Sequence, residues 1–398
     1  MSARLGLWLI GARGGVAATT VVGLIALGKR LADQTALVTA TPPFDALPLP
    51  AWDQFVIGGH EIRAVRLVDE ALRLVTESRV LSRELVEQCT AELHAIDARI
   101  RPGTLWGVGP TIEALADSSV PRDESPAQAV ARIRADLQAF QRDHDLEHVI
   151  VVNVASTEPP VDGSSLPAQW DQMHKLLAAP DCPLPASSLY AAAALDGGCS
   201  YLNFTPSLGS APEAFTQLAL ARGTRHMGCD GKTGETLLKS VLAPMFRARN
   251  LRVMSWVGHN IFGNMDGRVL DDPANKQTKV ASKSHLLTEI LGYHPQTLVS
   301  IEYIQSLGDW KTAWDHIHFS GFLGTPMTMQ FIWQGCDSLL AAPLVLDLVR
   351  LTDVARQRGV SGRMPFLACF FKSPYGAGEP RFERQFEILE AWAAAPHS

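Results

Sequence analysis

The sequence has few charged residues and no excess of basic ones. Asp, Glu, Lys and Arg make up 19% of its 398 residues, and the formal net charge is -6. Proteins that bind nucleic acid hold its phosphates with clustered lysine and arginine. This balance argues against a general affinity for nucleic acid, although it leaves room for a local basic pocket built from a few lysines.

Cysteine is scarce and scattered. None of the six cysteines forms a C-x-x-C pair, so their spacing suggests neither a structural zinc site nor a disulfide framework, and we expect no metal. They stand at Cys89, Cys182, Cys199, Cys229, Cys336 and Cys369. This usage is typical of a reducing compartment, and we expect a cytoplasmic protein.

No hydrophobic run is long enough to cross a membrane. The apolar stretch at residues 5–10 ends at Gly11 and falls far short of a bilayer span. The glycine-rich segment after it does not resemble the cleavage site of a signal peptide. With 46% hydrophobic residues, the composition is that of an ordinary globular protein, for which we expect no membrane association.

Internal repeats and low-complexity tracts are also lacking. The length allows two domains with cores of their own, or one large domain with an insertion. The proline-rich residues 41–50 predict a loop, and residues 159–185 contain enough Pro, Ser and Asp to form an exposed excursion.

The chain opens with a strand, a turn and a helix. Residues 5–10 predict a short buried strand, residues 11–15 a tight turn and residues 16–29 a helix. This order is the start of many nucleotide-binding α/β domains.

Alternating helices and strands continue from there. Amphipathic patterns predict helices at 70–87 and 125–144, and the β-branched run at 149–154 is typical of a central parallel strand. Such alternation predicts an α/β fold with a doubly wound parallel sheet. Further strands are expected at 201–204, 251–257, 298–304 and 322–333, and further helices at 211–221, 235–248, 282–291 and 339–351.

The glycine turn Gly11-Ala12-Arg13-Gly14-Gly15 has the context that a dinucleotide-binding fingerprint needs. Glycines there let the backbone approach a pyrophosphate, whose charge the helix N-terminus stabilises. The spacing is not G-x-G-x-x-G, so the segment also allows a tight turn that binds nothing. A P-loop at 228–233 is excluded, because His226 stands where that motif requires its first glycine.

Several later segments place lysines beside turns. Residues 230–234 precede a predicted helix, so backbone N–H groups and Lys232 could cradle an anion. A turn at 264–267 is followed by Lys279 and Lys283, whose spacing puts both on one helical face. Further segments of this kind are residues 308–311, 337–340 and 371–374.

Taken in order, these segments resemble the signature blocks of the myo-inositol-1-phosphate synthase family. The G-D-D-L-K-S-G-Q-T block of the family corresponds to residues 228–236. Its N-N-D-G turn and the two lysines that follow are similar to residues 264–267, Lys279 and Lys283. The remaining blocks resemble residues 308–311 (G-D-S-K), 335–343 (C-E-D-S-L-L-A-x-P), 372–374 (K-A-P), 155–158 (A-N-T-E) and 203–206 (N-G-S-P). Together the blocks cover roughly residues 11–374.

The resemblance implies an NAD-dependent isomerase that converts D-glucose 6-phosphate to an inositol monophosphate. In the family, oxidation at C5 acidifies the C6 protons, the resulting enolate attacks the C1 aldehyde, and the ring ketone is then reduced by the same tightly held cofactor. Position by position, the resemblance implies the catalytic residues Asp230, Lys279, Lys283, Lys311, Asp337 and Lys372.

This set also makes chemical sense without the family. An anionic substrate, an enolate and an alkoxide all need positive charge aimed at them, and clustered ammonium groups lower one another's pKa, so that one can act as a base. Any single lysine is nevertheless most often a solvated surface residue. The predicted roles are proton transfer at the oxidised carbon for Lys279 with Asp337 as relay, oxyanion binding for Lys311 and Lys372, and phosphate binding for Lys283 and Lys232.

The resemblance also implies the binding residues. NAD contacts are expected from Gly11, Ala12, Arg13, Gly14, Gly15, Val16, Ser156, Thr157, Asp309 and Ser338. Substrate contacts are expected from Lys232, Thr233, Gly234, Asn264 and Asp266. His316 and His318 could form a metal pair on a strand, but no third ligand is evident, and we treat them as structural.

The chain departs from the family's pattern at several positions. Gly231 stands where Leu is common, Leu237 where Lys is common, and Cys336 replaces the Glu of the C-E-D block. The core lysines are retained, so we expect NAD redox and aldol chemistry. The changes put the identity of the substrate in question.

The implied architecture is a Rossmann-type NAD domain made of residues 1–236 and 339–398. An α/β catalytic and oligomerisation domain, residues 237–338, is inserted before the C-terminal tail, and the family suggests a homotetramer. Two alternatives stay open: an NAD-dependent dehydrogenase or cyclase acting on another phosphosugar, and a non-catalytic NAD-binding protein. Four retained lysines argue against the second, because a scaffold has no need of them.

Overall fold

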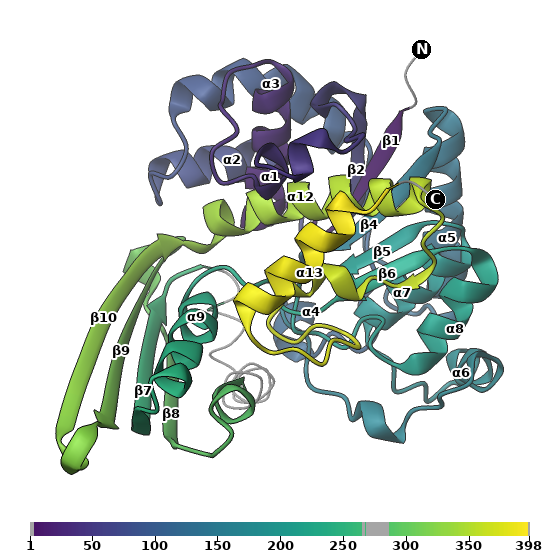
Figure 1. Ribbon diagram of the computed structural model, residues 1–398. Helices are drawn as coiled ribbons and strands as arrows, with labels where there is room; N and C mark the ends of the chain where they lie inside the picture. The colour runs from purple at the N-terminus through teal and green to yellow at the C-terminus, as the bar shows by residue number, and fades with distance from the viewer. Residues whose placement is uncertain (1–3, 265–266, 268–285, 397–398) are drawn as a thin grey trace.

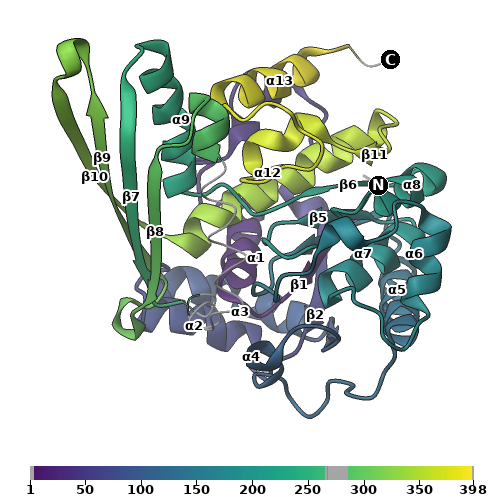
Figure 2. The same ribbon diagram turned by 90° about the horizontal axis from the view of Figure 1, so that it is seen from below.

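The computed structural model describes residues 4–264, 267 and 286–396. Two sheets organise this part of the chain: one of seven strands and one of four. Figures 1 and 2 show the four-stranded sheet beside the larger one, with α12 running from the end of β10 onto the larger sheet. Within the described residues, no helix combines the length and apolar character that crossing a bilayer requires.

The seven-stranded sheet has the order β11-β6-β5-β4-β1-β2-β3, and every neighbouring pair in it is parallel. This is the strand order of the Rossmann fold with one strand added at the edge, and it reverses between β1 and β4. The predicted doubly wound sheet is confirmed. Its strands are β1 (Leu5–Ile10), β2 (Phe55–Glu61), β3 (Ile100–Pro102), β4 (His148–Asn153), β5 (Ser200–Asn203), β6 (Arg225–Gly228) and β11 (Gly362–Arg363).

Helices cover both faces of this sheet because its strands carry apolar side chains on both sides. On β1, Leu7 and Leu9 pack into one core cluster, and Trp8 and Ile10 pack into another. The first cluster lies under α1 (Gly15–Gly28), α2 (Leu67–Thr76), α3 (Arg83–Asp97) and α12 (Asp337–Gln357). The second lies under α5 (Pro126–Asp143), α6 (Trp170–Leu177), α7 (Ala186–Asp196) and α8 (Glu213–Arg222).

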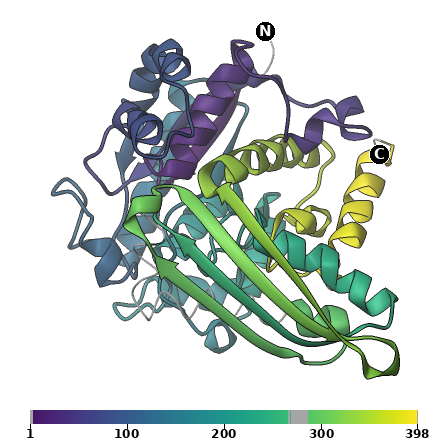
Figure 3. The ribbon, with the colours of Figure 1, turned by 90° about the vertical axis from the view of Figure 1, so that its left-hand side faces the viewer.

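The four-stranded sheet has the order β10-β9-β7-β8 and is mixed. Its β7 pairs parallel with β8 and antiparallel with β9, which forms a hairpin with β10. Helix α9 (Glu235–Ala248) packs on one face, and Figure 3 shows none of the described helices across the opposite face. The strands are β7 (Arg252–Phe262), β8 (Gln296–Tyr303), β9 (Trp310–Ser320) and β10 (Pro326–Cys336). The predicted second α/β unit is therefore present.

Some predicted elements differ from those in the structure. The helix expected at 70–87 is two helices, α2 and α3, separated by a turn in which Arg79 has a φ of 55°. The excursion expected at 159–185 contains α6, which buries Met173 and Leu177 because apolar residues four apart share a helical face. The strand expected at 322–333 begins only at Pro326, after a short 3-10 turn. Part of the helix expected at 282–291 lies outside the described residues.

The segment between α1 and β2 is bound to α12 by a buried carboxylate. Oδ2 of Asp347 accepts a hydrogen bond from the backbone of Val38 at 2.7 Å, and Oδ1 accepts bonds from the backbone and hydroxyl of Thr39 at 3.0 and 2.6 Å. Arg350 donates to the same hydroxyl and stacks on Trp52. The loop predicted at 41–50 is thus anchored at its start.

We predict that Asp347→Ala lowers the free energy of unfolding by about 2–4 kcal/mol, because buried N–H and O–H donors lose their acceptor. The measurement is denaturant unfolding followed by circular dichroism. Asp45→Ala, which removes an exposed carboxylate from the same loop, is the control and should change the stability little. Equal stability of the two variants would contradict the anchoring role.

Candidate functional site

The turn after β1 is shaped for close approach of a ligand. Gly11 has a φ of +77°, and a Cβ there would lie 2.8 Å from the Cα of Ala155, so only glycine fits. Gly14 is the N-cap of α1, and no side-chain cap bonds to the first turn of this helix in the described structure. The N–H groups of that turn are therefore available to an anion.

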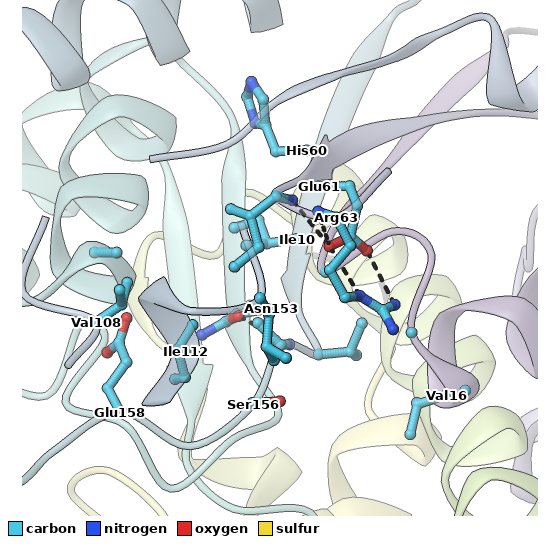
Figure 4. Close-up of a pocket in the computed structure, with 18 of the residues that line it drawn as sticks. Ile10, Val16, His60, Glu61, Arg63, Val108, Ile112, Asn153, Ser156 and Glu158 are labelled. Atoms are coloured by element: carbon cyan, nitrogen blue, oxygen red, sulfur yellow. Dashed lines mark hydrogen bonds and ion pairs between the residues drawn. The ribbon is translucent and has the colours of Figure 1, made fainter. Parts of the chain in front are cut away.

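A pocket lies beside this turn, where the strand order reverses, which is the usual place for a dinucleotide in such a sheet. It has a volume of about 1060 Å³, including its open mouth. Figure 4 shows side chains from β1, β2 and β4 around it. Its lining includes Gly11, Gly14, Gly15, Val16, Glu61, Arg63, Arg73, Asn153, Ser156, Glu158, Asn264, Asp309 and Ser338.

Glu61 ends β2 at the rim of this pocket and is 6% exposed. Its Oε1 accepts bonds from the backbone of Ile62 and Arg63, and its Oε2 accepts one from the backbone of Arg13 at 2.8 Å. An acid at the end of the second strand is where Rossmann domains hold the ribose hydroxyls of NAD. Glu61 is not among the residues predicted from the sequence, because the pattern of β2 is hard to recognise there. The signal was the Phe-Val-Ile run followed by Gly-Gly-His-Glu.

The far end of the pocket is apolar and suits a planar base. Val108, Ile112 and Leu115 line it from the segment around α4 (Pro110–Glu113). Glu158 lies in the same part of the pocket, where its carboxylate accepts bonds from the backbone and hydroxyl of Ser187 at 2.8 and 2.5 Å. Burial raises the pKa of Glu158 to about 7. The glycine turn, the carboxylate of Glu61 at the end of β2 and the apolar end of the pocket together fit a dinucleotide such as NAD.

The predicted NAD residues divide into two groups. Seven of them line the pocket: Gly11, Gly14, Gly15, Val16, Ser156, Asp309 and Ser338. Ala12, Arg13 and Thr157 do not. The Arg13 guanidinium instead pairs with Asp97 at 2.8 Å and donates to the backbone of Arg63, because its side chain runs along the start of α2. Arg13 therefore supports the turn through contacts outside the pocket.

Asp230 and Lys372, predicted to share a site, meet in the structure. Their side chains form an ion pair at 2.7 Å, and both are largely buried. The backbone N–H of Lys372 donates to the carbonyl of Asp230, and Gly231 forms an isolated antiparallel β-bridge with Phe371. Asp230 has a φ of +61°, and its N–H donates to the carbonyl of Thr205. The C-terminal segment is thus joined to the turn after β6.

Buried polar side chains connect the nucleotide pocket with Thr205, whose backbone carbonyl accepts the N–H of Asp230. Asn153, which lines the pocket, donates to the Asn203 amide oxygen at 3.2 Å and to the Thr205 hydroxyl at 3.3 Å. Asn203 in turn donates to the hydroxyl of Tyr375 at 3.1 Å. The ends of β4 and β5 therefore fix the loop on which Asp230 stands.

Lys232 has surroundings different from those expected for a phosphate ligand. Its ammonium donates to Gln385 of α13 (Phe382–Ala394) at 2.8 Å and lies over the ring of Phe382. Burial lowers its pKa to about 8. Neither Lys232 nor its neighbours Thr233 and Gly234 line the pocket. Of the predicted substrate residues, Asn264 lines it, and Asp266 lies outside the described residues.

Of the remaining predicted catalytic residues, the structure describes two. Lys311 is the second residue of β9, and its ammonium lies 5.5 Å from the ring centre of Phe262 on β7. Asp337 is the first residue of α12. Lys279 and Lys283 lie outside the described residues, so their roles stay predictions.

A buried charge cluster under the second sheet was not predicted. The Lys239 ammonium lies 2.5 Å from Glu235 and 3.6 Å from Asp315, and the indole of Trp256 donates to Asp315 at 2.7 Å. Gly258 leaves room for it, since a Cβ there would lie 2.7 Å from Glu235. These contacts hold α9, which follows the turn of Asp230 in the chain, against β7 and β9.

In the described part of the chain, no group of three or more His, Cys, Asp or Glu side chains could hold a metal ion. His316 and His318 lie on β9 across from Gln330 and Thr328 of β10. They face the side of the sheet away from α9.

A family profile described as Myo-inositol-1-phosphate synthase matches residues 37–393. The chain belongs to the myo-inositol-1-phosphate synthase family. A curated relative, inositol-3-phosphate synthase 1 of Bacteroides thetaiotaomicron, is 31% identical over 93% of this chain and 89% of its own length. The human protein of the same name is 32% identical over 85% of this chain, which spans 60% of the human protein's length.

Solved structures show the same fold. Inositol-3-phosphate synthase of Caenorhabditis elegans is 24% identical and aligns with a TM-score of 0.86 over 98% of this chain and 85% of its own. A myo-inositol-1-phosphate synthase-related protein of Thermotoga maritima aligns with a TM-score of 0.80 over 99% of this chain and 100% of its own, at 24% identity. Membership in the myo-inositol-1-phosphate synthase family confirms the predicted family, an enzyme of this type and NAD as its cofactor.

We predict that Glu61→Ala weakens NAD binding about tenfold, because the ribose hydroxyls lose a charged acceptor. NADP binding should weaken less, since the added phosphate no longer meets a carboxylate. Titration calorimetry with each cofactor measures both. Glu84→Ala, at an exposed acid in the first turn of α3, is the control. An unchanged ratio of NAD to NADP affinity in the Glu61 variant would contradict this assignment.

Proposed function

We propose that this chain converts D-glucose 6-phosphate to 1D-myo-inositol 3-phosphate. Relatives that it matches over most of its length are named inositol-3-phosphate synthase. The observation that carries the proposal is the buried Asp230–Lys372 ion pair, joined through Asn153, Asn203 and Thr205 to a pocket that fits NAD.

Bound NAD supplies reversible two-electron oxidation of a sugar carbon, which acidifies the hydrogens on its neighbour. The chain's own residues bind the cofactor and the sugar and orient them. The first turn of α1 receives the pyrophosphate and Glu61 the ribose hydroxyls. Asn264, which lines the pocket, holds a sugar hydroxyl in this proposal.

Positive charge for the anionic species comes from lysines on different elements. The side-chain nitrogen of Lys372 lies beside the Asp230 carboxylate, so the pair can hold an oxyanion and pass a proton between oxygen atoms. Lys311 enters from β9, and Lys279 and Lys283 complete the set in our proposal, with Lys279 at the proton transfer and Asp337 as relay. Lys232 faces α13, so here it supports the Asp230 turn rather than the phosphate.

The test is incubation of the purified protein with D-glucose 6-phosphate, with inositol phosphate followed by phosphorus NMR. We expect turnover without added reductant, and we expect Lys372→Met to lower it by about 100-fold or more through loss of oxyanion binding. Lys175→Met, at an exposed lysine of α6, is the matched control. If glucose 6-phosphate gives no product while another sugar phosphate reduces bound NAD, the reaction proposed here is wrong.

The proposal includes a homo-oligomer, a tetramer as the family suggests, assembled through the outer face of the second sheet. Ile332 and Leu298 are 71% and 54% exposed there, and Trp314 stacks on His259 between them. Monomers rarely leave such an apolar surface open. The outward residues of β10 carry no charge, so two copies of this face can meet around a two-fold axis without like charges opposing.

Domain limits and location complete the proposal. Residues 1–236 and 339–398 form the NAD domain, and residues 237–338 form the catalytic and oligomerisation domain. All six cysteines lie in the described residues and are free thiols, which supports a reducing compartment, the cytoplasm.

We predict that Ile332→Asp dissociates the oligomer, because it places charges against each other in a buried interface. Light scattering after size exclusion measures the mass. Leu220→Asp changes a comparably exposed apolar residue on α8, away from this face, and should leave the mass unchanged. A wild-type protein that runs as a monomer would refute the interface.

A further inference from the structure

His60 is a buried histidine near the end of β2, next to the glycine turn. It is 0% exposed, and it lines the nucleotide pocket beside Glu61. Its backbone carbonyl accepts the N–H groups of Gly11 and Ala12 at 2.9 and 3.1 Å. These bonds hold the start of the turn that leads into α1, where a dinucleotide places its pyrophosphate. The position of this one carbonyl group therefore sets where the turn begins.

Two glycines before His60 give its neighbours room. A Cβ on Gly58 would lie 2.8 Å from the indole ring of Trp8, and a Cβ on Gly59 would lie 2.5 Å from the Cβ of Ala12. The end of β2 thus packs tightly against a side chain of β1 and against the turn that follows β1. A shift of this strand end would be passed on to the turn.

The imidazole of His60 has one partner on each nitrogen. Nδ1 lies 2.9 Å from the indole nitrogen of Trp8, and Nε2 lies 3.1 Å from Oδ2 of Asp136 on α5. An indole N–H can only donate, so Nδ1 is the acceptor. The single proton of the neutral ring then stands on Nε2, which donates it to the Asp136 carboxylate. The rings of Trp8 and Tyr190 pack against the imidazole.

We propose that His60 is a positioning residue for NAD: as a neutral imidazole with its proton on Nε2, it ties the end of β2 to β1 and α5 and so fixes the carbonyl that holds the glycine turn. This inference rests on the proposed function, because it takes NAD as the ligand of the pocket. A protonated ring would carry a second N–H on Nδ1, directed at the indole N–H of Trp8, and two donors cannot bond to each other. The neutral ring is therefore the form that keeps the turn in place.

The surroundings of His60 favour the neutral ring. Burial lowers its pKa, the bond and the charge of Asp136 act in the opposite direction, and the charge of Arg132 lowers the pKa further. Arg132 lies 3.8 Å from Asp136 and pairs with Glu124, whose charge opposes it. Tyr190 of α7 adds no charge, because burial raises its pKa. The bond to the indole is therefore present at neutral pH and is lost only as pH falls through the lowered pKa of His60.

The protonation of the ring is tested by ¹⁵N NMR of histidine side chains in the NAD-bound protein, with the spectrum of His60→Phe identifying the resonances of His60. We expect a bare Nδ1, a protonated Nε2 and no charge on the ring at neutral pH. Trp8→Phe removes the donor that favours the neutral form and should raise the pKa of His60. A proton on Nδ1 in the wild type would overturn the proposal.

The positioning role is tested by the affinity for NAD, measured by titration calorimetry. His60→Phe keeps a ring but loses both bonds, so it should bind NAD about tenfold more weakly. Hydrogen exchange at the N–H groups of Gly11 and Ala12 should become faster. Asp136→Ala should act in the same direction, whereas Asp136→Asn keeps an oxygen that can accept from Nε2 and should restore the affinity.

His94→Phe is the matched control, because it changes an exposed histidine of α3 and should alter neither readout. If His60→Phe is less stable but binds NAD as tightly as the wild type, with the turn exchanging no faster, His60 serves packing alone. The positioning role is then overturned and the proposed function is untouched. If the wild type binds no NAD, the proposed function fails together with this inference.

Discussion

The parallel direction of the seven-stranded sheet is the constraint on which this molecule depends. Because its strands run the same way, their carboxyl ends share one edge, and the residues just past those ends become neighbours. Gly11 after β1, Glu61 at the end of β2, Asn153 at the end of β4 and the turn of Asp230 after β6 all come from that edge. Segments far apart in the sequence thereby supply one site.

The second sheet and the C-terminal segment close the site from the other side. Asp309 directly precedes β9, and Ser338 is the second residue of α12. Both line the nucleotide pocket from the side of the second sheet. Lys372 arrives from the tail and pairs with Asp230. Removing one member of such a buried pair is more damaging than the net strength of the pair suggests, because the partner is left charged without compensation. A site built this way needs the whole chain folded.

Local pattern allowed much of the framework to be predicted. The strand, turn and helix of residues 5–29, the β-branched β4 and the limits of α9 follow from periodicity and breakers. It failed where the fold overrides local pattern. Helix α7 is buried on all sides and alanine-rich, so it has no amphipathic signal. In β2, Gly58 and Gly59 interrupt the apolar pattern, which hid Glu61.

The motifs predicted part of the lining of the candidate site but not its geometry. Asp230 and Lys372, which the motif order assigned to one site, form an ion pair, and Asp309 and Ser338, which it assigned to the cofactor, line the pocket beside the glycine turn. The motif order could not reveal that Lys232 faces Gln385, because α13 lies 153 positions further along the chain. Nor could it show that Arg13 faces Asp97. Side-chain direction in both cases is set by tertiary packing rather than by neighbours in sequence.

The six free thiols have a practical consequence for experiments on assembly. Burial raises the pKa of every one of them, and the thiolate is the form that reacts with maleimides. The native cysteines should therefore react slowly with maleimides and interfere little with site-specific labelling. A cysteine introduced at Phe322, 87% exposed at the tip between β9 and β10, would take up a fluorophore selectively and report on how copies of the sheet approach one another.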